Sequence, residues 1–418
     1  MNSLPYLSAL KDMRKVFLFV TLVSLSSCIT QGQELDRKAI LRHIRTLAND
    51  SLAGRGTGTA GERSAAAYIE REFAQLYLIP KGDASYLQGF PFAKGAHGAG
   101  ATGMANNVIG FLDNGGKTTI VIGAHYDHLG TDGQGSSLDA NPTNKIHNGA
   151  DDNASGVAGV LELARYFATN QIRENSNFIF VCFSGEELGL LGSKYFTEHP
   201  PVDLASVDYM INLDMIGRLN TQTRQLLIHG TGTSPVWEPL LKNIEKDGLS
   251  ITTDSSGVGP SDHTSFYLKN IPVLHFFTGS HEDYHKPGDD IDKINADGEL
   301  RVLKLIIRII ESLNNEPKLA FLPTRNKMQS RQTAFKVTLG IMPSYASSGE
   351  GLKVDGVSDG KPAAMAGIKT GDVIIQMGEF PIDDIYKYME ALGKFEKGQS
   401  VPVKIKRGTE VLELSVTF

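Results

Sequence analysis

TTIVIGAHYDH, residues 118–128, is an apolar run that leads directly into His125, Asp127 and His128. Three further apolar runs lead into groups that bind metals: 178–185 into Glu186 and Glu187, 209–213 into Asp214, and 272–277 into the stretch from His281 to His285. Because ligands in open α/β sheets bind beyond the carboxyl ends of the strands, we expect these four segments to converge on one crevice.

Strand-like and helix-like segments alternate over most of the chain. Short apolar runs lie at 106–112, 118–125, 177–183, 209–215, 225–230 and 272–277, and the helix candidates are 62–78, 154–169, 187–197, 235–247 and 297–314. This alternation predicts an α/β fold with a mixed, mostly parallel central sheet flanked by helices.

The pattern changes after Asn315 and divides the chain into domains. Residues 316–334 are polar, include two prolines and lack periodicity, which is typical of a linker. From Phe335 to Phe418 the runs are short and β-like, with one helix candidate at 383–393. We therefore expect a larger α/β domain at 36–315 and a small, mostly β domain at 335–418.

The N-terminus has the features of a signal peptide, predicted over residues 1–27. Arg14 and Lys15 precede an apolar run, 16–25, that is too short to span a bilayer. Residues 25–28, Leu-Ser-Ser-Cys, resemble a bacterial lipobox, in which Cys28 is acylated. The prediction is an exported lipoprotein, anchored in the periplasm or at the cell surface; the alternative is ordinary cleavage and secretion.

Composition argues against a nucleic-acid partner. The formal net charge is −6, and no long run of like charge forms a basic face. Small-molecule or peptide chemistry is the better expectation.

Cys182 would be the one cysteine left after acylation of Cys28, and its place in an apolar run predicts a buried, inert thiol.

The chemistry of the residues suggests roles for three short stretches of the sequence. In an extended segment His125 and Asp127 project to the same side, so Asp127 is placed to orient the His125 imidazole, although a solvated pair fits as well. GADDNASG places Asp151, Asp152 and Asn153 before a helix start, where Asp and Asn are favoured N-caps, and a carboxylate there could equally bridge two metals. Of Glu186 and Glu187, one carboxylate can bind a metal while the other stays free to accept a proton.

Five motifs, in this order, resemble the aminopeptidase S and aminopeptidase Y family of di-zinc metallopeptidases, which also includes glutaminyl cyclases. They are GAHYDH (123–128), GADDNASG (149–156), SGEELGLLGS (184–193), NLDMIG (212–217) and EDYHKPGDD (282–290). The resemblance covers roughly residues 36–315 and implies the zinc exopeptidase fold.

The resemblance also implies a role for each matching residue. His125 and Asp214 would hold one zinc, Glu187 and His285 would hold a second zinc, and Asp152 would bridge the two ions. Glu186 would be the general base that activates a metal-bridging water, and Tyr284 would stabilise the oxyanion. Asp262 would support the site without binding metal. We expect the histidines His128, His147, His263, His275 and His281 to be surface or core residues, and the 129–147 loop to overhang the site.

The C-terminal domain resembles PDZ domains of bacterial proteases. Leu339, Gly340 and Ile341 stand early in it, and residues 359–382 carry the more specific pattern. In such domains an extended peptide adds to the sheet edge and its carboxylate binds the first loop, so peptide C-termini are the expected ligands. The alternative is that this domain only braces the catalytic one.

The sequence therefore predicts an exported di-zinc aminopeptidase that removes N-terminal residues from peptides. Alternatives are a single-zinc amide transferase like glutaminyl cyclase and a peptide-binding protein that acts through its PDZ domain. Carboxypeptidase or dipeptidase specificity also stays open, because the zinc ligands are shared more widely than the amine-binding pocket.

Overall fold

The computed structural model describes residues 34–93, 102–324, 337–343, 351–357, 360–383 and 385–418. The predicted signal peptide, Cys28 and residues 325–334 of the predicted linker lie outside the described residues. Within the described ranges, no helix combines the length and apolar character needed to cross a membrane.

The first domain alternates strands with helices, as predicted. Its helices are α2 (Arg37–Leu47), α3 (Ala60–Gln75), α4 (Gly156–Thr169), α5 (Leu191–Glu198), α6 (Trp237–Asn243), α7 (His263–Tyr267) and α8 (Ala296–Leu313). Its main strands are β1 (Ile79–Pro80), β2 (Leu87–Ala93), β3 (Thr102–Leu112), β4 (Thr118–His125), β7 (Ser176–Phe183), β8 (Val207–Leu213), β9 (Gln225–His229), β10 (Ser250–Asp254) and β11 (Val273–Phe277). A separate small ribbon pairs β5 (Gly130–Thr131) with β6 (Ile146–His147).

The main strands form one nine-stranded sheet in the order β1-β3-β7-β4-β8-β11-β9-β10, with β2 paired to β3. The pairings β7·β4, β4·β8 and β8·β11 are parallel, so these four central strands end at the same edge. β3 joins β7 and β9 joins β11 in antiparallel pairings. The predicted mixed sheet is confirmed, and its parallel part lies at the centre.

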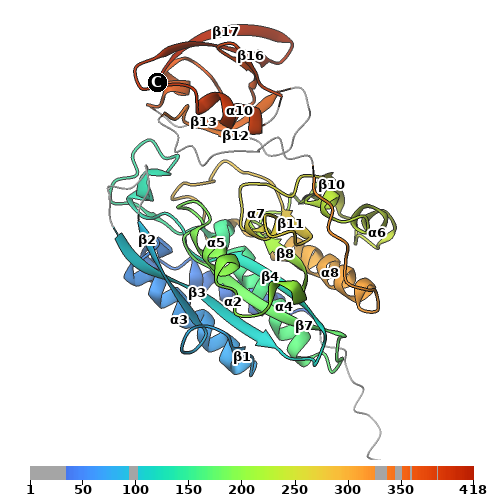
Figure 1. The fold of residues 1–418 in the computed structure, drawn as a ribbon. Helices are drawn as coiled ribbons and strands as arrows, with labels where there is room; N and C mark the ends of the chain where they lie inside the picture. Colours follow the sequence, from blue (N-terminus) through green and yellow to red (C-terminus); the bar gives the residue numbers. More distant parts are fainter. Residues whose placement is uncertain (1–33, 94–101, 325–336, 344–350, 358–359, 384) are drawn as a thin grey trace, which may run out of the picture. The chain divides into compact units, whose positions relative to one another are not determined.

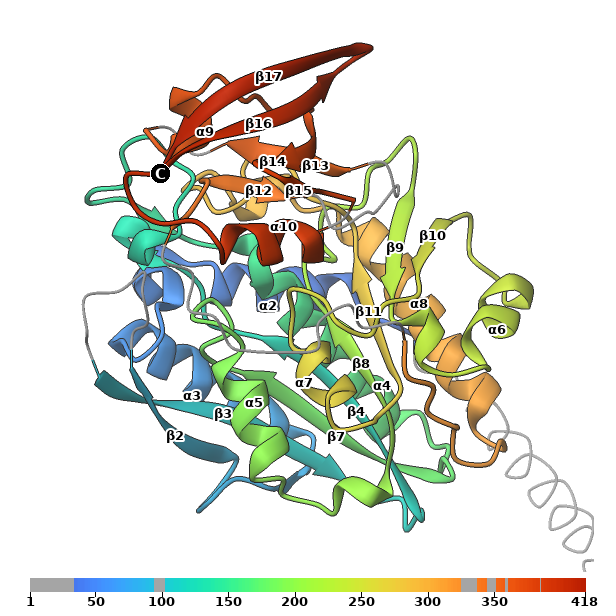
Figure 2. The ribbon, with the colours of Figure 1, turned by 45° about the horizontal axis from the view of Figure 1, so that its top comes forward.

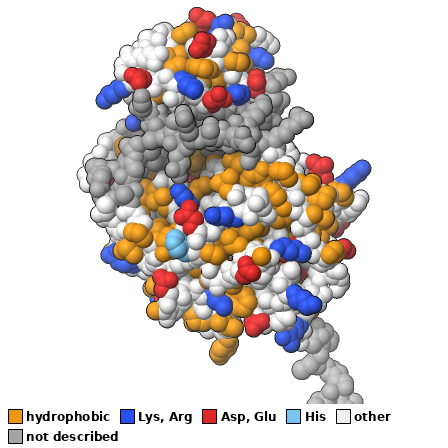
Figure 3. All heavy atoms as spheres, in the orientation of Figure 1, with side chains coloured by type: hydrophobic (Ala, Val, Ile, Leu, Met, Phe, Trp, Pro, Cys, Tyr) orange, Lys and Arg blue, Asp and Glu red, His pale blue; other side chains and the backbone are white. Residues whose placement is uncertain are grey.

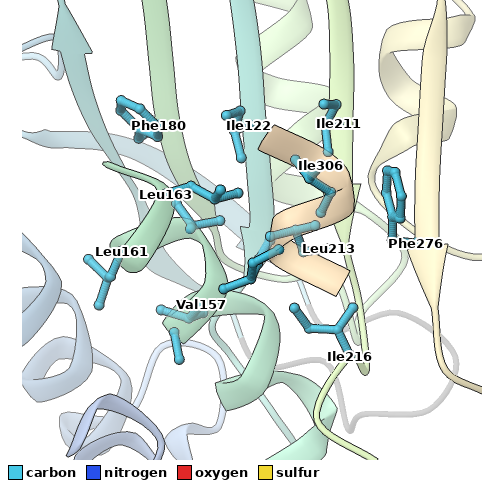
Figure 4. Close-up of a cluster of buried hydrophobic side chains, with 14 of the residues drawn as sticks. Ile122, Val157, Leu161, Leu163, Phe180, Ile211, Leu213, Ile216, Phe276 and Ile306 are labelled. Carbon is cyan, nitrogen blue, oxygen red and sulfur yellow. The ribbon is translucent and has the colours of Figure 1, made fainter. Parts of the chain in front are cut away.

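Helices cover both faces of this sheet, as Figure 1 and, from another side, Figure 2 show. Side chains alternate along β4: Ile120 and Ile122 join the core under α4 and α8, whereas Val121 joins the core under α5 and α7. Figure 4 shows Ile122, Ile211 and Phe276 from the strands lying against Val157 and Leu163 of α4 and Ile306 of α8. This double cover explains why the central strands are apolar along their whole length.

The C-terminal domain has its own sheet and its own core. Its elements are β12 (Ile341–Pro343), β13 (Leu352–Val357), α9 (Pro362–Met365), β14 (Val373–Met377), β15 (Phe380–Pro381), α10 (Ile385–Leu392), β16 (Ser400–Arg407) and β17 (Glu410–Thr417). Antiparallel strands run in the order β12-β13-β14-β16-β17 around buried Leu339, Val354, Ile374 and Val403. The prediction of a small, mostly β domain is confirmed.

The start of the predicted linker packs against the first domain. Leu319 is buried in the core, and its N–H donates to Asp208 Oδ1 at 2.7 Å. Thr324 Oγ1 lies 3.0 Å from the Tyr267 hydroxyl. The structured part of the first domain therefore runs on to Thr324, beyond the boundary expected at 315.

Candidate metal centre

The four predicted segments meet at one edge of the sheet. β4 ends at His125, β7 leads into Glu186 and Glu187, β8 leads into Asp214, and β11 is followed by the turn that carries His285. Because β7, β4, β8 and β11 are parallel neighbours, their carboxyl ends bring these side chains together.

Two groups of ligand atoms share Asp152. His125 Nε2 lies 3.4 Å from Asp152 Oδ1 and 3.4 Å from Asp214 Oδ1. His285 Nε2 lies 3.3 Å from Asp152 Oδ2 and 3.3 Å from Glu187 Oε2. Each oxygen of Asp152 therefore faces a different group, which is the arrangement of a bridging carboxylate.

These spacings fit zinc. Ligand atoms about 2.0–2.1 Å from a tetrahedral zinc lie about 3.3 Å from one another, which matches the distances in both groups. Three protein ligands in each group leave one coordination position open, as in catalytic zinc sites. All the donors are nitrogen or oxygen, and the geometry accommodates the ligand set that the family resemblance implied.

His128 also reaches the second group, contrary to the expectation that it would be an ordinary surface or core histidine. Its side chain, with those of Asp152 and Glu187, offers atoms within 4.8 Å of one another. However, His128 Nδ1 lies only 2.8 Å from Glu187 Oε1, a hydrogen-bond length that is too short for two ligands of one zinc. We therefore interpret His285 as the ligand and His128 as the residue that orients Glu187.

Asp127 is fully buried and connects several parts of the site. Its carboxylate accepts hydrogen bonds from Thr57 Oγ1 at 2.7 Å and from the Glu186 N–H at 3.2 Å. His125 Nδ1 lies 3.2 Å from the Asp127 main-chain oxygen and 3.7 Å from Asp127 Oδ1. The closer contact of the imidazole is thus with the main chain of Asp127, while the carboxylate fixes the segment of Glu186.

Adjacent residues of the loop before α4 make different hydrogen bonds. The N-cap of α4 is Ser155, and Asn153 Oδ1 accepts from the N–H of Gly156, the first residue of this helix. The Asp289 carboxylate accepts from the N–H groups of Asp151 and Asp152. These bonds hold Asp152 with its side chain facing the metal groups; its peptide bond to Asn153 is cis.

Glu186 and Glu187 lie in a turn, not in the helix predicted at 187–197. The N–H groups of Gly189 and Leu190 both bond to the Glu186 oxygen, and both residues have positive φ, so α5 begins only at Leu191. Burial raises the pKa of Glu186 well above its usual value, and the charges of Glu187 and Asp214 add to this while His125 opposes it. Burial also disfavours charged Glu187, but the imidazoles of His285 and His128 hold its pKa well below the usual range.

A pocket opens beside the ligands. On the first domain it is lined by His125, Asp152, Glu186, Asp214, Tyr284 and His285, by Met215, His229, His275 and Phe277, and by the loop residues Ser136, Ser137 and Leu138. The Tyr284 ring stacks on His285 with 3.9 Å between centroids. The Ser136 main-chain oxygen lies 3.1 Å from His285 Nδ1, so the 129–147 loop does overhang the site.

The other residues that were not expected to bind metal are four histidines and Asp262. His263 and His275 stack with 4.5 Å between centroids, and burial lowers the pKa of both, to about 3 for His263, so these rings are neutral. His147 is buried and bonds to Ser137 Oγ, while His281 Nε2 lies 3.2 Å from Asp151 Oδ2. Asp262 is fully buried, and burial raises its pKa to about 7.

Sequence reasoning missed the segment GRGTGTAGE, residues 54–62. It supplies Arg55, which is fully buried, Thr57, and Glu62, whose carboxylate accepts from the hydroxyls of Tyr126 and Ser184. The available signal was a lone arginine and a lone glutamate in a stretch of small, turn-forming residues, a weak pattern without the structure.

In the C-terminal domain, the three residues singled out lie at the start of the sheet. Leu339 is buried in the core, and Ile341 begins β12, the terminal strand of the sheet order. Gly340 has φ +74°, and an added Cβ would lie 2.2 Å from Lys361 Cβ, so the turn requires glycine.

Comparison with known proteins agrees with this architecture. Residues 107–310 match the model of Peptidase family M28, and residues 334–418 match the model of the PDZ domain. Aminopeptidase YwaD of Bacillus subtilis (strain 168) is 30% identical over 187 residues, which are 43% of this chain and 37% of that protein. The chain spans only 37% to 51% of the length of such curated relatives.

Solved structures share the fold. The structure of BSAP, a zinc aminopeptidase from Bacillus subtilis, has a TM-score of 0.53 and 18% identity, covering 69% of this chain and 99% of that one. Bacteroides thetaiotaomicron glutaminyl cyclase bound to N-acetylhistamine has a TM-score of 0.54 and 20% identity, covering 69% and 100%. The two family models confirm the resemblance carried by the motifs, with a match to Peptidase family M28 at residues 107–310 followed by a match to the PDZ domain at residues 334–418.

Proposed function

We propose that this protein is an exported di-zinc aminopeptidase that removes N-terminal residues from peptides. The observation that carries the proposal is the position of Asp152, with one oxygen 3.4 Å from His125 Nε2 and the other 3.3 Å from His285 Nε2. A carboxylate shared in this way by two complete ligand groups is suited to bridge two metal ions.

When bound, the zinc ions would polarise the substrate carbonyl and lower the pKa of a shared water. The residues of the chain supply the rest of the chemistry. Glu186 lines the pocket and is outside both ligand groups, so its carboxylate is suited to accept the proton and pass it to the leaving amine. Tyr284 lines the same pocket and is suited to donate a hydrogen bond to the carbonyl oxygen.

Recognition of the substrate follows from the charges. Glu186 and Asp214 line the pocket and are suited to bind a free N-terminal ammonium group. Met215, His229, His275 and Phe277 line the same pocket and would face the first side chain of the peptide. Burial keeps the imidazoles of His229 and His275 neutral by lowering their pKa, so this part of the pocket favours an uncharged side chain.

A glutaminyl cyclase is the rival within this fold, since one such enzyme is among the structural neighbours. The relative YwaD is named an aminopeptidase, and the complete second ligand group of Glu187 and His285 favours the hydrolase. A panel of free, N-acetylated and N-terminal glutaminyl peptides separates the two. We expect release of the first amino acid from free peptides only. Equal cleavage of blocked peptides, or cyclised glutaminyl product without amino acid release, would refute the proposal.

Location and peptide capture complete the proposal. A lipid on Cys28 would anchor the mature protein, and β12 of the PDZ domain, with Gly340 beside it, would pair with an extended peptide whose carboxylate binds the preceding loop. The anchor predicts that the protein partitions with membranes and that Cys28→Ala releases it or stalls its processing. Wild-type protein found only in the soluble exported fraction would exclude the anchor but not the activity.

A further inference from the structure

Arg55 is a fully buried arginine whose hydrogen bonds go to main-chain carbonyl oxygens. Its Nε donates to Tyr126 O at 2.8 Å, Nη1 donates to Leu47 O and to Asn148 O at 2.7 Å, and Nη2 donates to Gly149 O at 3.0 Å. Among the ion pairs of the described residues, none involves Arg55. A buried guanidinium without a paired carboxylate is costly, so its position calls for an explanation.

Three of the four carbonyls that Arg55 binds belong to the segments that carry His125 and Asp152. Tyr126 lies between His125 and Asp127, and Asn148 and Gly149 lie just before Asp152. The guanidinium is rigid and planar, so its bonds fix the distance between these two segments. That distance decides how far His125 Nε2 stands from Asp152 Oδ1, which is 3.4 Å here.

The turn that carries Arg55 is itself seated on the same loops. Gly54 has φ +69°, and an added Cβ would lie 2.4 Å from His147 O and 2.8 Å from Gly130 O. The Arg55 main-chain oxygen accepts from the N–H of His128 at 3.2 Å. The main chain of this turn therefore packs directly on the main chain of the neighbouring loops, which fixes the position of the Arg55 Cα.

The charge of Arg55 should weaken metal binding, whereas its hydrogen bonds should favour metal binding by holding the ligand segments in place. Burial lowers the pKa of Arg55 to about 10, so the group stays charged at neutral pH, and the nearby charges of Asp152 and Asp127 favour that state. A fixed positive charge near the centre repels divalent cations. An arginine kept for its charge alone would thus weaken metal binding, and its removal would strengthen it.

We propose that Arg55 is a positioning residue of the metal centre, which sets the spacing of the His125 and Asp152 segments by binding the carbonyls of Tyr126, Asn148 and Gly149. The proposal rests on the proposed di-zinc function. Residues that orient metal ligands typically change metal affinity by about 10- to 100-fold when they are replaced.

The test compares the zinc affinity of metal-free full-length proteins by competition with a chromophoric chelator, after circular dichroism has shown that each is folded. Arg55→Lys keeps the charge but loses the planar fork, and Arg55→Gln loses both. Arg173→Lys is the matched control, because Arg173 Nε donates to a carbonyl, Asn114 O, near the start of β4 and far from its metal-binding end. Ile306→Val controls for a mild loss of core stability.

We expect zinc affinity to fall about tenfold or more in both Arg55 variants and to stay unchanged in both controls. Unchanged affinity in folded Arg55→Lys, or tighter binding in Arg55→Gln, would overturn the proposal. Failure of both Arg55 variants to fold would overturn it too, since the residue would then serve the fold and not the metals. A wild-type protein that binds no zinc would instead refute the proposed function, and this inference with it.

Discussion

At the scale of residues, the two adjacent glutamates have opposite surroundings. Glu187 faces the imidazoles of His285 and His128, whereas the pKa of Glu186 is raised by burial and by the other carboxylates. We expect Glu186→Gln to keep bound zinc but to lose about 10²- to 10⁴-fold in turnover, because it would remove only the proposed base. Glu187→Gln should lower zinc occupancy, since an amide is a weak ligand. Metal analysis beside kinetics checks both; loss of zinc from Glu186→Gln would show that the roles are reversed.

Glu62 gives a pH-dependent prediction. Burial raises its pKa from 4.5 to about 7, and Asp127 adds to the shift. In the unfolded chain Glu62 ionises near its usual pKa of 4.5. Between this pH and about pH 7 the folded protein therefore holds a proton on Glu62 that the unfolded chain has lost. The free energy of unfolding consequently falls as the pH rises through this range. At about 1.4 kcal/mol per pKa unit the decline is about 3 kcal/mol.

The comparison that isolates this effect is wild type against Glu62→Gln, by denaturant unfolding of the metal-free proteins. From about pH 5 to about pH 8 the free energy of unfolding should fall by about 3 kcal/mol more in wild type than in the variant. Parallel pH profiles would show that the pKa of Glu62 is not raised.

The proposed ligands could be expected from sequence because each follows a recognisable strand or stands in a distinctive motif. Arg55, Thr57 and His128 could not, because they act by hydrogen bonds to main-chain atoms or to other side chains, and such partners depend on tertiary structure. Likewise, nothing in GADDNASG says which side chain accepts from the first N–H of α4; in the structure it is that of Asn153.

At the scale of elements, the junction before α4 carries a strict steric requirement. Gly156 has φ −59°, so its backbone does not need glycine, but an added Cβ would lie 2.3 Å from Asn153 Oδ1 and 2.4 Å from Leu213 O. Glycine-to-alanine replacements in helices usually stabilise. Here we expect Gly156→Ala to destabilise by about 1–3 kcal/mol and to weaken zinc binding, because it displaces the segment of Asp152.

Gly159→Ala is the control in the same helix, since its Cβ would meet only the ends of flexible side chains, at 2.9 Å or more. Thermal unfolding and zinc titration of the two variants check the prediction. A Gly156→Ala protein as stable as wild type and with unchanged zinc affinity would contradict it.

Elements with a strong hydrophobic pattern were predictable, and those shaped by a turn were not. β4 matches its predicted range, because a strand buried on both faces is apolar throughout. The helix expected from residue 187 begins at Leu191, because positive φ at Gly189 and Leu190 keeps the glutamates in a turn. Edge strand β10 has largely exposed side chains and so gave no hydrophobic signal.

At the scale of the whole molecule, the catalytic domain should work without the C-terminal domain, provided that it is cut in the right place. A chain ending at Thr324 keeps buried Leu319 and its bond to Asp208, whereas one ending at Pro317 loses both. We expect the longer form to fold and to cleave aminoacyl amides as well as the full chain, and the shorter form to be less stable by about 2–5 kcal/mol.

What the Thr324 form should lose is affinity for longer peptides, seen as a raised KM, because a tethered PDZ domain raises the local concentration of substrate. Steady-state kinetics on short and long substrates checks this. If the Thr324 form is inactive on small amides, the PDZ domain is a structural brace. Figure 3 shows acidic and basic side chains interspersed on one face of the catalytic domain.

The most direct test of the central claim is to count zinc and identify the product in one titration. The metal-free full-length protein is titrated with zinc, bound metal is measured per chain, and the products from an unblocked peptide are identified at each step. We predict binding of two zinc ions per chain and release of the first amino acid, abolished by a chelator and restored by zinc. Saturation at a single zinc, or full release of amino acid from the metal-free protein, would contradict the account.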